Sequence, residues 1–144
     1  MLYPALQLPK APLKLSKQDE QFYVWCVVRK KKFQLTPEEW VRQHVIHFLL
    51  GDKKIPIERI NCEHVLNING QKRRCDVIVI DKVGSISLIV ECKAAQISID
   101  EKVFLQTSNY VQSSQARYFW MTNGLSHHLY DCLNSKTLEG FPIL

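Results

Sequence analysis

The stretch from Arg73 to Ala94 reads RRCDVIVIDKVGSISLIVECKA, and it decides the fold of the chain. Two strand-length runs, Val77–Ile80 and Ser87–Val90, flank a short segment in which Gly84 is the turn residue. Mainly apolar, β-branched runs on either side of a glycine-containing turn are typical of a β-hairpin. The sequence therefore predicts two neighbouring antiparallel strands over this stretch.

Three ionisable residues, Asp76, Glu91 and Lys93, lie inside or at the ends of these strands. A turn symmetric about Val83 and Gly84 places Asp76 opposite Glu91, with the two Cβ atoms roughly 4.5–5.5 Å apart. Because side chains alternate along a strand, Lys93 shares a face with Glu91. The pattern predicts two carboxylates and an amine together on one side of the hairpin.

Two carboxylates placed opposite each other on a sheet repel and destabilise it. A hard divalent cation held by oxygen ligands would remove that repulsion. A lysine beside such an ion can orient or activate a water molecule, or offset charge on a phosphoryl oxygen. The alternative is an ion-pair cluster on a solvated sheet face, in which Lys93 neutralises Glu91.

Four motifs occur in order along the chain: TPEEWVRQ at 36–43, RRCDVIVID at 73–81, LIVECKA at 88–94 and TNG at 122–124. The Asp, hairpin and Glu-x-Lys arrangement resembles the PD-(D/E)xK nuclease core. The ordered set looks like the N-terminal nuclease domain of type I restriction enzyme R subunits, from about residue 22 to the end. One departure is Cys75, which stands where proline is usual.

The resemblance implies a restriction-endonuclease-like α/β fold and a catalytic set of Asp76, Glu91 and Lys93. It also implies Mg²⁺ as the cofactor, for which Mn²⁺ can substitute, and DNA as the nucleic-acid partner. Asp76 and Glu91 would be the metal ligands. The chain contains no G-x-x-x-x-G-K-[ST] phosphate loop, so we expect the nuclease part without a helicase motor.

The first predicted helix opens at Thr36, a good N-cap, with Pro37 at the first helical position and Glu39 completing a capping box. Helical spacing places Glu38 on the buried stripe and turns Glu39 away from it. The resemblance implies that a glutamate on this helix completes the metal site. Glu38 is favoured, with Glu39 as the alternative, and a helix-dipole role for Glu38 stays open. Arg42, one turn later, could pair with Glu38 or bind a phosphate.

A second helix is expected from about Ile99 to Ser114, with Ser98 as its cap. Gln106 and Tyr110 are four residues apart and share a face. The resemblance implies that this pair borders the metal site and contacts substrate; the alternative is a helix edge packed on the sheet. Arg74 belongs to a basic cluster, 72–74, that adjoins the site, and we expect it to contact substrate.

Composition supports a single domain with a basic surface. The chain has 144 residues and a net charge of +5, which favours a polyanionic partner such as nucleic acid. Its five scattered cysteines do not form a disulfide pattern, and Cys62 with His64 lacks a second pair for zinc. No signal peptide or membrane span is evident, so we expect a cytoplasmic protein.

The organisation along the chain follows from these elements. Residues 1–21 are expected to form an extended arm, because Pro4, Pro9 and Pro12 disfavour a helix. Residues 22–144 form one domain, in which an N-terminal β-hairpin (22–28 and 33–35) is added to a mixed central sheet flanked by helices.

Two functions of different classes remain. The first is a metal-dependent nuclease that hydrolyses phosphodiester bonds in DNA. The alternative is a catalytically silent module that binds nucleic acid or protein with the same fold. A separate protein partner or a homo-oligomer is also compatible with the sequence.

Overall fold

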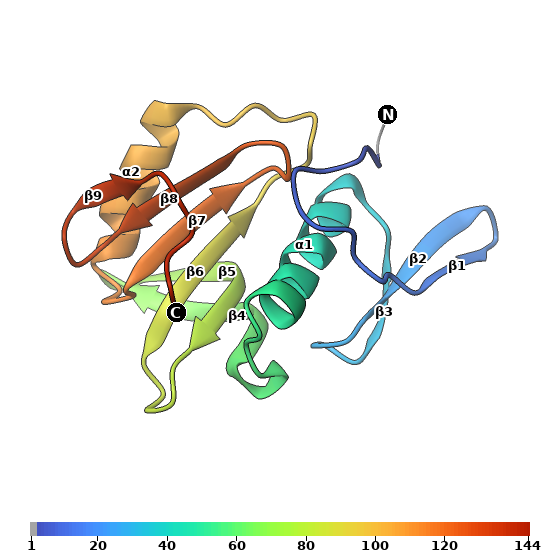
Figure 1. The fold of residues 1–144 in the computed structure, drawn as a ribbon, viewed down its shortest axis with the longest axis horizontal. Coiled ribbons are helices and arrows are strands. Elements are labelled where there is room, and N and C mark those ends of the chain that lie inside the picture. Colours follow the sequence, from blue (N-terminus) through green and yellow to red (C-terminus); the bar gives the residue numbers. More distant parts are fainter. Residues whose placement is uncertain (1–2) are drawn as a thin grey trace.

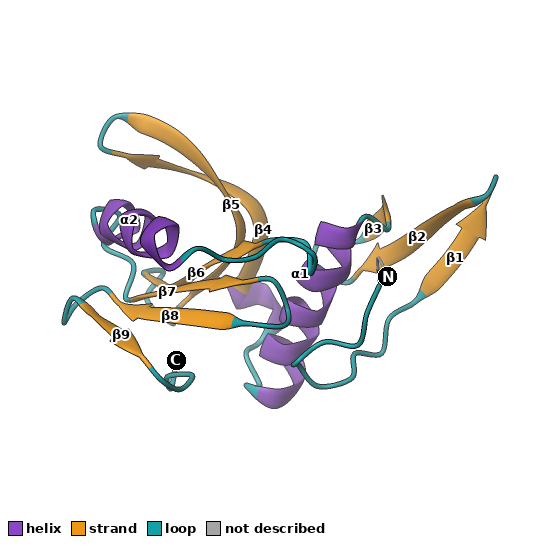
Figure 2. Cartoon of the chain, turned by 90° about the horizontal axis from the view of Figure 1, so that it is seen from above, coloured by secondary structure: helices purple, strands orange, loops and turns teal. Residues whose placement is uncertain are grey.

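The computed structural model describes residues 3–144, in which two sheets lie on either side of one helix. A six-stranded mixed sheet has the order β4-β5-β6-β7-β8-β9, and a separate antiparallel sheet has the order β1-β2-β3. Helix α1 stands between them (Figures 1 and 2). The elements are β1 (Leu15–Gln18), β2 (Gln21–Cys26), β3 (Lys31–Gln34), α1 (Pro37–His47), β4 (Ile60–Ile68), β5 (Gln71–Ile80), β6 (Ile86–Cys92), α2 (Glu101–Gln112), β7 (Tyr118–Thr122), β8 (His127–Asp131) and β9 (Lys136–Leu138).

The two helices cover opposite faces of the large sheet. Val41 and Val45 of α1 belong to the same buried cluster as Val77 and Val90. On the other face, Phe104 of α2 packs in a second cluster with the alternate strand residues, including Ile78, Ile89 and Phe119. The predicted fold class, a restriction-endonuclease-like α/β core with a mixed sheet flanked by helices, is confirmed.

The central hairpin has the predicted register. Val77 pairs with Val90, Ile78 with Ile89, and Val79 with Leu88. The register shifts by one position at the turn end, where Ile80 pairs with Ile86. Gly84 at the turn has a φ of +86°, which glycine adopts without strain.

Strand β7 is parallel to β6, and the connection between them passes through α2. This crossover brings the Thr122–Gly124 motif beside the end of β6, where the Lys93 N–H donates to the Thr122 carbonyl at 2.8 Å. The Asn123 side chain donates to the Ile97 carbonyl at 2.8 Å and accepts from the Ser126 N–H at 2.8 Å. The motif therefore fixes the loop that follows the Glu-x-Lys segment.

The N-terminal segment is more structured than the sequence indicates, and residues 1 and 2 of the predicted arm lie outside the described residues. Strand β1 pairs with β2, so the expected hairpin is a three-stranded sheet. The preceding segment crosses the core: the Gln7 N–H donates to the Gly124 carbonyl at 2.8 Å, and the Trp40 indole donates to the Pro4 carbonyl at 2.9 Å.

The helix ends contain two further features. The chain continues from the last residue of α1 into a π-helical turn, Phe48–Asp52. The cap of α2 is Asp100, whose carboxylate accepts from the Lys102 N–H at 2.7 Å; the predicted cap, Ser98, was wrong.

Among residues 3–144, no helix is long and apolar enough to cross a membrane.

Candidate functional site

Strands β5 and β6 place Asp76 beside the Glu-x-Lys segment. One Asp76 carboxylate oxygen accepts a hydrogen bond from the Cys92 N–H at 2.7 Å, between Glu91 and Lys93 in the chain. The Lys93 ammonium lies 3.6 Å from a Glu91 carboxylate oxygen. Asp76 and Glu91 are both about four-fifths buried, whereas 43% of the Lys93 side chain is exposed. The three predicted catalytic residues therefore gather at the end of β6, with the lysine reaching solvent.

Helix α1 contributes a buried cation to this cluster. The Arg42 guanidinium lies 3.1 Å from Asp76, 3.2 Å from Glu38 and 2.5 Å from Glu39. Burial opposes its charged form, but the charges of Glu39 and Asp76 raise the pKa of Arg42 above its usual range. The predicted pairing of Arg42 with Glu38 is present, and the same side chain also holds Asp76.

Glu38 and Glu39 have exchanged the environments that helical spacing predicts. Glu39 is 4% exposed and Glu38 has a half-exposed side chain, so the inward orientation predicted for Glu38 was wrong. The reason is a second buried side of α1. Arg29, which follows β2, reaches Glu39 at 2.5 Å, and Gln43, one turn later, donates to Glu39 at 2.9 Å.

The N-cap itself forms as predicted. The Thr36 hydroxyl accepts from the Glu39 N–H at 3.0 Å. The second hydrogen bond of a capping box, from the Thr36 N–H to the Glu39 carboxylate, does not form. The Thr36 N–H donates instead to the Gln34 carbonyl at 3.0 Å, and the Glu39 carboxylate binds arginine side chains. Glu39 is therefore a structural anchor between α1 and the β1–β3 sheet.

Glu38 nevertheless faces the acidic cluster. Burial and the nearby negative charge of Asp76 raise the pKa of Glu38, while the charges of Arg42 and Lys93 partly offset this. A carboxylate whose charged form is disfavoured by a neighbouring carboxylate gains from an added cation. Glu38 is thus placed where a third acidic group can influence the site, and its role as a ligand stays a prediction.

The second helix reaches the site through an arginine that the sequence interpretation did not single out. Arg73 forms an ion pair with Glu91, and its guanidinium lies 5.5 Å from the Tyr110 ring centroid. The Tyr110 hydroxyl donates to the Ile68 carbonyl at 3.3 Å. Gln106, one turn earlier on α2, is exposed.

Arg74 points elsewhere: it is 70% exposed and lies 3.9 Å from Glu63. Strict alternation would put Arg74, and not Arg73, on the side of Asp76 and Glu91. This alternation breaks down within β5. Cys75 packs in the same cluster as Ile78, whereas two residues three positions apart on a regular strand face opposite sides. Opposite this point, Glu63 has a φ of +56°, and the strand pairing omits it. The basic cluster 72–74 could be found from sequence, but its inward member could not.

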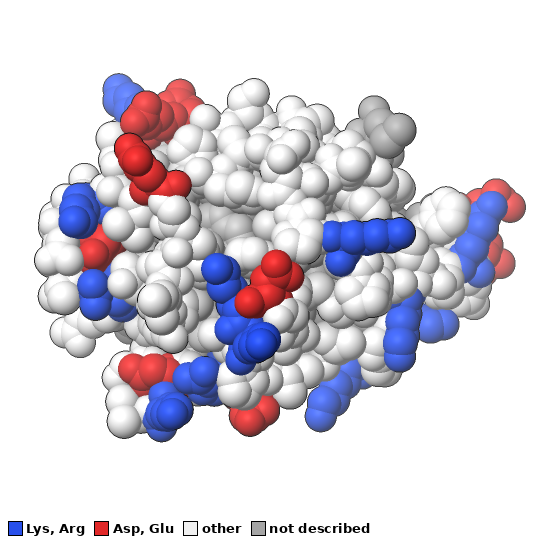
Figure 3. All heavy atoms as spheres, viewed as in Figure 1, with Lys and Arg blue, Asp and Glu red and all other residues white. Residues whose placement is uncertain are grey.

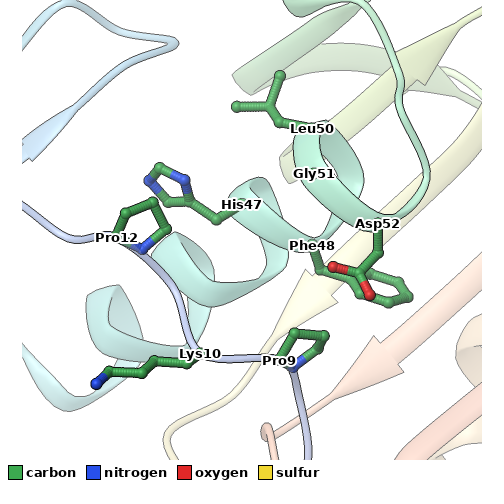
Figure 4. A pocket seen from close by; sticks show the side chains of 8 residues that line it. All are labelled: Pro9, Lys10, Pro12, His47, Phe48, Leu50, Gly51 and Asp52. Carbon is green, nitrogen blue, oxygen red and sulfur yellow. The ribbon is translucent and has the colours of Figure 1, made fainter.

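No compact metal-binding trio is present in the described part of the chain. Among residues 3–144, no three His, Cys, Asp or Glu side chains are grouped to hold an ion. A pocket of about 260 Å³ lies between the N-terminal segment and the end of α1, lined by Lys10, His47, Phe48 and Asp52 among others (Figure 4). It contains none of the predicted site residues, so the acidic cluster is separate from it.

A mixed sheet with one helix on each face, and an Asp and a Glu-x-Lys segment on its central hairpin, defines a restriction-endonuclease-like protein. The model of the family described as "Type I restriction enzyme R protein N terminus" matches residues 37–142, and the chain belongs to this family. No match was found among curated proteins. The matched span begins at α1, so the β1–β3 sheet lies outside it.

Proposed function

We propose that the protein is a Mg²⁺-dependent nuclease of the PD-(D/E)xK type that hydrolyses DNA. One observation carries the proposal. The Asp76 carboxylate accepts the N–H of Cys92, the residue between Glu91 and Lys93, so an acid, a second acid and an amine meet at one strand end. Membership of the restriction R subunit family supports DNA as the substrate.

The residues at this site suit a magnesium ion better than a metal that is coordinated by protein ligands alone. Mg²⁺ commonly keeps several waters and takes only one or two carboxylates together with substrate phosphates. Asp76 and Glu91 would supply these carboxylates, and Glu38 would act directly or through water. Bound there, the ion would polarise the scissile phosphate and lower the pKa of a water molecule.

The side chains of this chain would divide the remaining work. Lys93 is tethered to Glu91 and partly exposed, so its ammonium can position a water or stabilise charge on a phosphate oxygen. Arg42 and the Cys92 N–H hold opposite oxygens of Asp76 and fix the orientation of that carboxylate. Arg42 is buried, so it serves as a positioning residue.

Three residues would border the substrate. Arg74 has an exposed side chain that can reach a phosphate, and Gln106 is exposed on α2. Tyr110 would act through Arg73, whose guanidinium lies near its ring. These roles extend the site from the end of β6 towards α2.

The test is a cleavage assay of the full chain with plasmid and single-stranded DNA in Mg²⁺ or Mn²⁺. We expect cleavage that Glu91→Ala and Lys93→Ala each reduce by at least about a hundredfold, as is usual for loss of a catalytic group. Glu101→Ala and Lys136→Ala are matched controls, because both residues are exposed and lie on α2 and β9. Intact DNA throughout, or equal cleavage by site and control variants, would refute the nuclease.

A second candidate function is a silent nucleic-acid-binding module. The observation that favours it is that both acids already have guanidinium partners, Arg42 for Asp76 and Arg73 for Glu91. Calorimetric titration with Mn²⁺ separates the two. Binding that Asp76→Asn abolishes supports the nuclease, whereas salt-sensitive DNA binding with no metal binding and no cleavage supports the silent module.

A further inference from the structure

The positive charge of the protein is concentrated at one end. Residues 1–35 carry seven Lys or Arg and two acidic residues, whereas residues 36–144 carry twelve of each. The entire net charge of +5 therefore belongs to the N-terminal segment and the β1–β3 sheet. In Figure 3, basic side chains are spread over the end of the molecule that β1–β3 form in Figure 1.

Most of these cations are not neutralised within the protein. Lys14, Lys30, Lys31 and Lys32 are exposed, and none of them forms an ion pair with an acidic side chain of residues 3–144. Arg29 differs, because it turns inward to Glu39. The lysines thus present uncompensated charge to solvent, which favours a polyanion.

One face of the β1–β3 sheet combines this charge with aromatic rings. Val24 and Cys26 of β2 are fully buried, so the alternate residues, Tyr23 and Trp25, point outward. Trp25 is 38% exposed.

Two rows of side chains cross this outward face. In the first, Trp25 pairs with Lys32 of β3, and the Trp25 backbone N–H donates to the carbonyl of Lys14, the residue before β1, at 3.0 Å. The register therefore places one lysine on each side of Trp25. In the second, Tyr23 pairs with Ser16 and Gln34.

We propose that this outward face of β1–β3 binds single-stranded DNA, with an unpaired base stacked on Trp25 and the adjacent phosphates bound by Lys14 and Lys32. Neighbouring strands are about 4.8 Å apart, so both ammonium groups reach the backbone on either side of one stacked base. Aromatic rings beside a basic strip are the general means by which proteins hold single strands without reading their sequence. An exposed indole has no such partner on a fully paired duplex.

The position of the sheet connects it to the candidate site. Strand β3 leads through two residues into α1, whose first turn carries Glu38. Arg29 and Glu39 join the sheet to α1, and Arg42 continues the ion pairs to Asp76. The sheet is therefore connected to the acidic cluster through α1, while its outward face points away from that helix. The inference rests on the proposed function for the choice of DNA among polyanions, and its test is independent of cleavage.

The experiment measures binding of the full chain to fluorescent oligothymidylate by anisotropy, in EDTA to prevent cleavage. We expect Trp25→Ala to weaken binding roughly 5- to 150-fold, the range for loss of one stacked base, and Trp25→Phe to restore most of it. The double variant Lys14→Gln, Lys32→Gln should lower the salt slope by about 0.7 for each phosphate that is no longer neutralised. Lys102→Gln, Lys136→Gln is the control with the same charge change, at exposed positions on α2 and β9.

Three results would overturn the inference: unchanged binding by Trp25→Ala, equal weakening by the two double variants, or a duplex that binds as tightly and as dependently on Trp25 as the single strand. If the parent fails to cleave DNA but binds it through Trp25, the proposed nuclease fails and this inference stands. If the parent cleaves DNA but Trp25→Ala binds the oligonucleotide as tightly as the parent does, the proposed nuclease stands and this inference fails.

Discussion

Replacing Glu39 and Glu38 by alanine, one at a time, separates the structural glutamate of α1 from the one that faces the site. Glu39 is 4% exposed and accepts from Arg29, Arg42 and Gln43. Removing one member of a buried ion pair costs about 3–5 kcal/mol, because the remaining charge stays buried. After the substitution, Arg42 still has two other carboxylates and Arg29 still has Glu63 at 3.7 Å. The total cost is therefore smaller than the sum of the costs of breaking each Glu39 ion pair separately. We expect Glu39→Ala to lower the free energy of unfolding by about 3–5 kcal/mol.

Glu38 provides the matched control in the same helical turn. Its side chain is 47% exposed and its one ion pair, with Arg42, is 3.2 Å long. Exposed pairs of this kind contribute at most about 1 kcal/mol. Its raised pKa shows that burial and Asp76 already disfavour its charge. We therefore expect Glu38→Ala to change stability by less than about 1 kcal/mol while it reduces cleavage.

Urea unfolding, followed by circular dichroism, measures both variants. With a slope of about 2 kcal/mol per molar urea, the Glu39→Ala midpoint should fall by roughly 2 M. Glu39→Gln, which keeps the volume and one acceptor, keeps the test measurable if the alanine variant does not fold. Equal midpoint shifts for Glu38→Ala and Glu39→Ala, or a loss below about 1 kcal/mol for Glu39→Ala, would refute the assignment of the buried anchor.

The remaining predictions concern the cations and the titrating carboxylates. Arg73→Gln should tighten Mn²⁺ binding by about fivefold in calorimetry, since a partly exposed ion pair worth roughly 1 kcal/mol no longer competes for Glu91; unchanged affinity would contradict this. Because the pKa of Glu38 is raised, Glu38 should take up a proton at a pH just above the usual pKa of glutamate, and Mn²⁺ binding should weaken there. Glu38→Gln should flatten this pH dependence of Mn²⁺ affinity. Burial of Asp131 opposes its charge, but hydrogen bonds, above all from Arg117, lower its pKa to about 2. Its stabilisation is therefore complete above the unfolded value near 4 and is lost as the pH falls towards 2. Asp131→Asn should cost about 1–2 kcal/mol at neutral pH, and acid titration of stability should show the difference from the parent shrinking below pH 4.

The sequence was sufficient for the features that depend on neighbours in the chain. The register of β5 and β6 follows from two apolar runs and a short turn, and the observed pairs Val77–Val90 and Ile78–Ile89 agree with it. The Asn69-Gly70 turn likewise has positive φ at both residues, the conformation that this residue pair favours between two antiparallel strands. These features need no information about distant segments.

The errors fall where a distant segment changes the environment of a residue. Helical spacing assigns one buried stripe to α1, but the β1–β3 sheet and Arg29 bury a second side, and Glu39 lies on it. The arginine beside Glu91, Arg73, was not singled out from the sequence for a similar reason. The distortion of β5 at Asp76 is matched by positive φ at Glu63 on β4, and a glutamate gives no sequence signal for that conformation.

The charges around the candidate site explain how the fold accommodates several clustered carboxylates. The nearby carboxylates and cations are equal in number. They are Glu38, Glu39, Asp76 and Glu91, against Arg29, Arg42, Arg73 and Lys93. A neutral cluster avoids the cost of like charges at partly buried positions. A divalent ion entering this cluster would leave two positive charges in excess, and phosphates of a bound strand would compensate them. The same charge balance would thus couple the proposed ion to a polyanionic substrate, and each should strengthen the binding of the other.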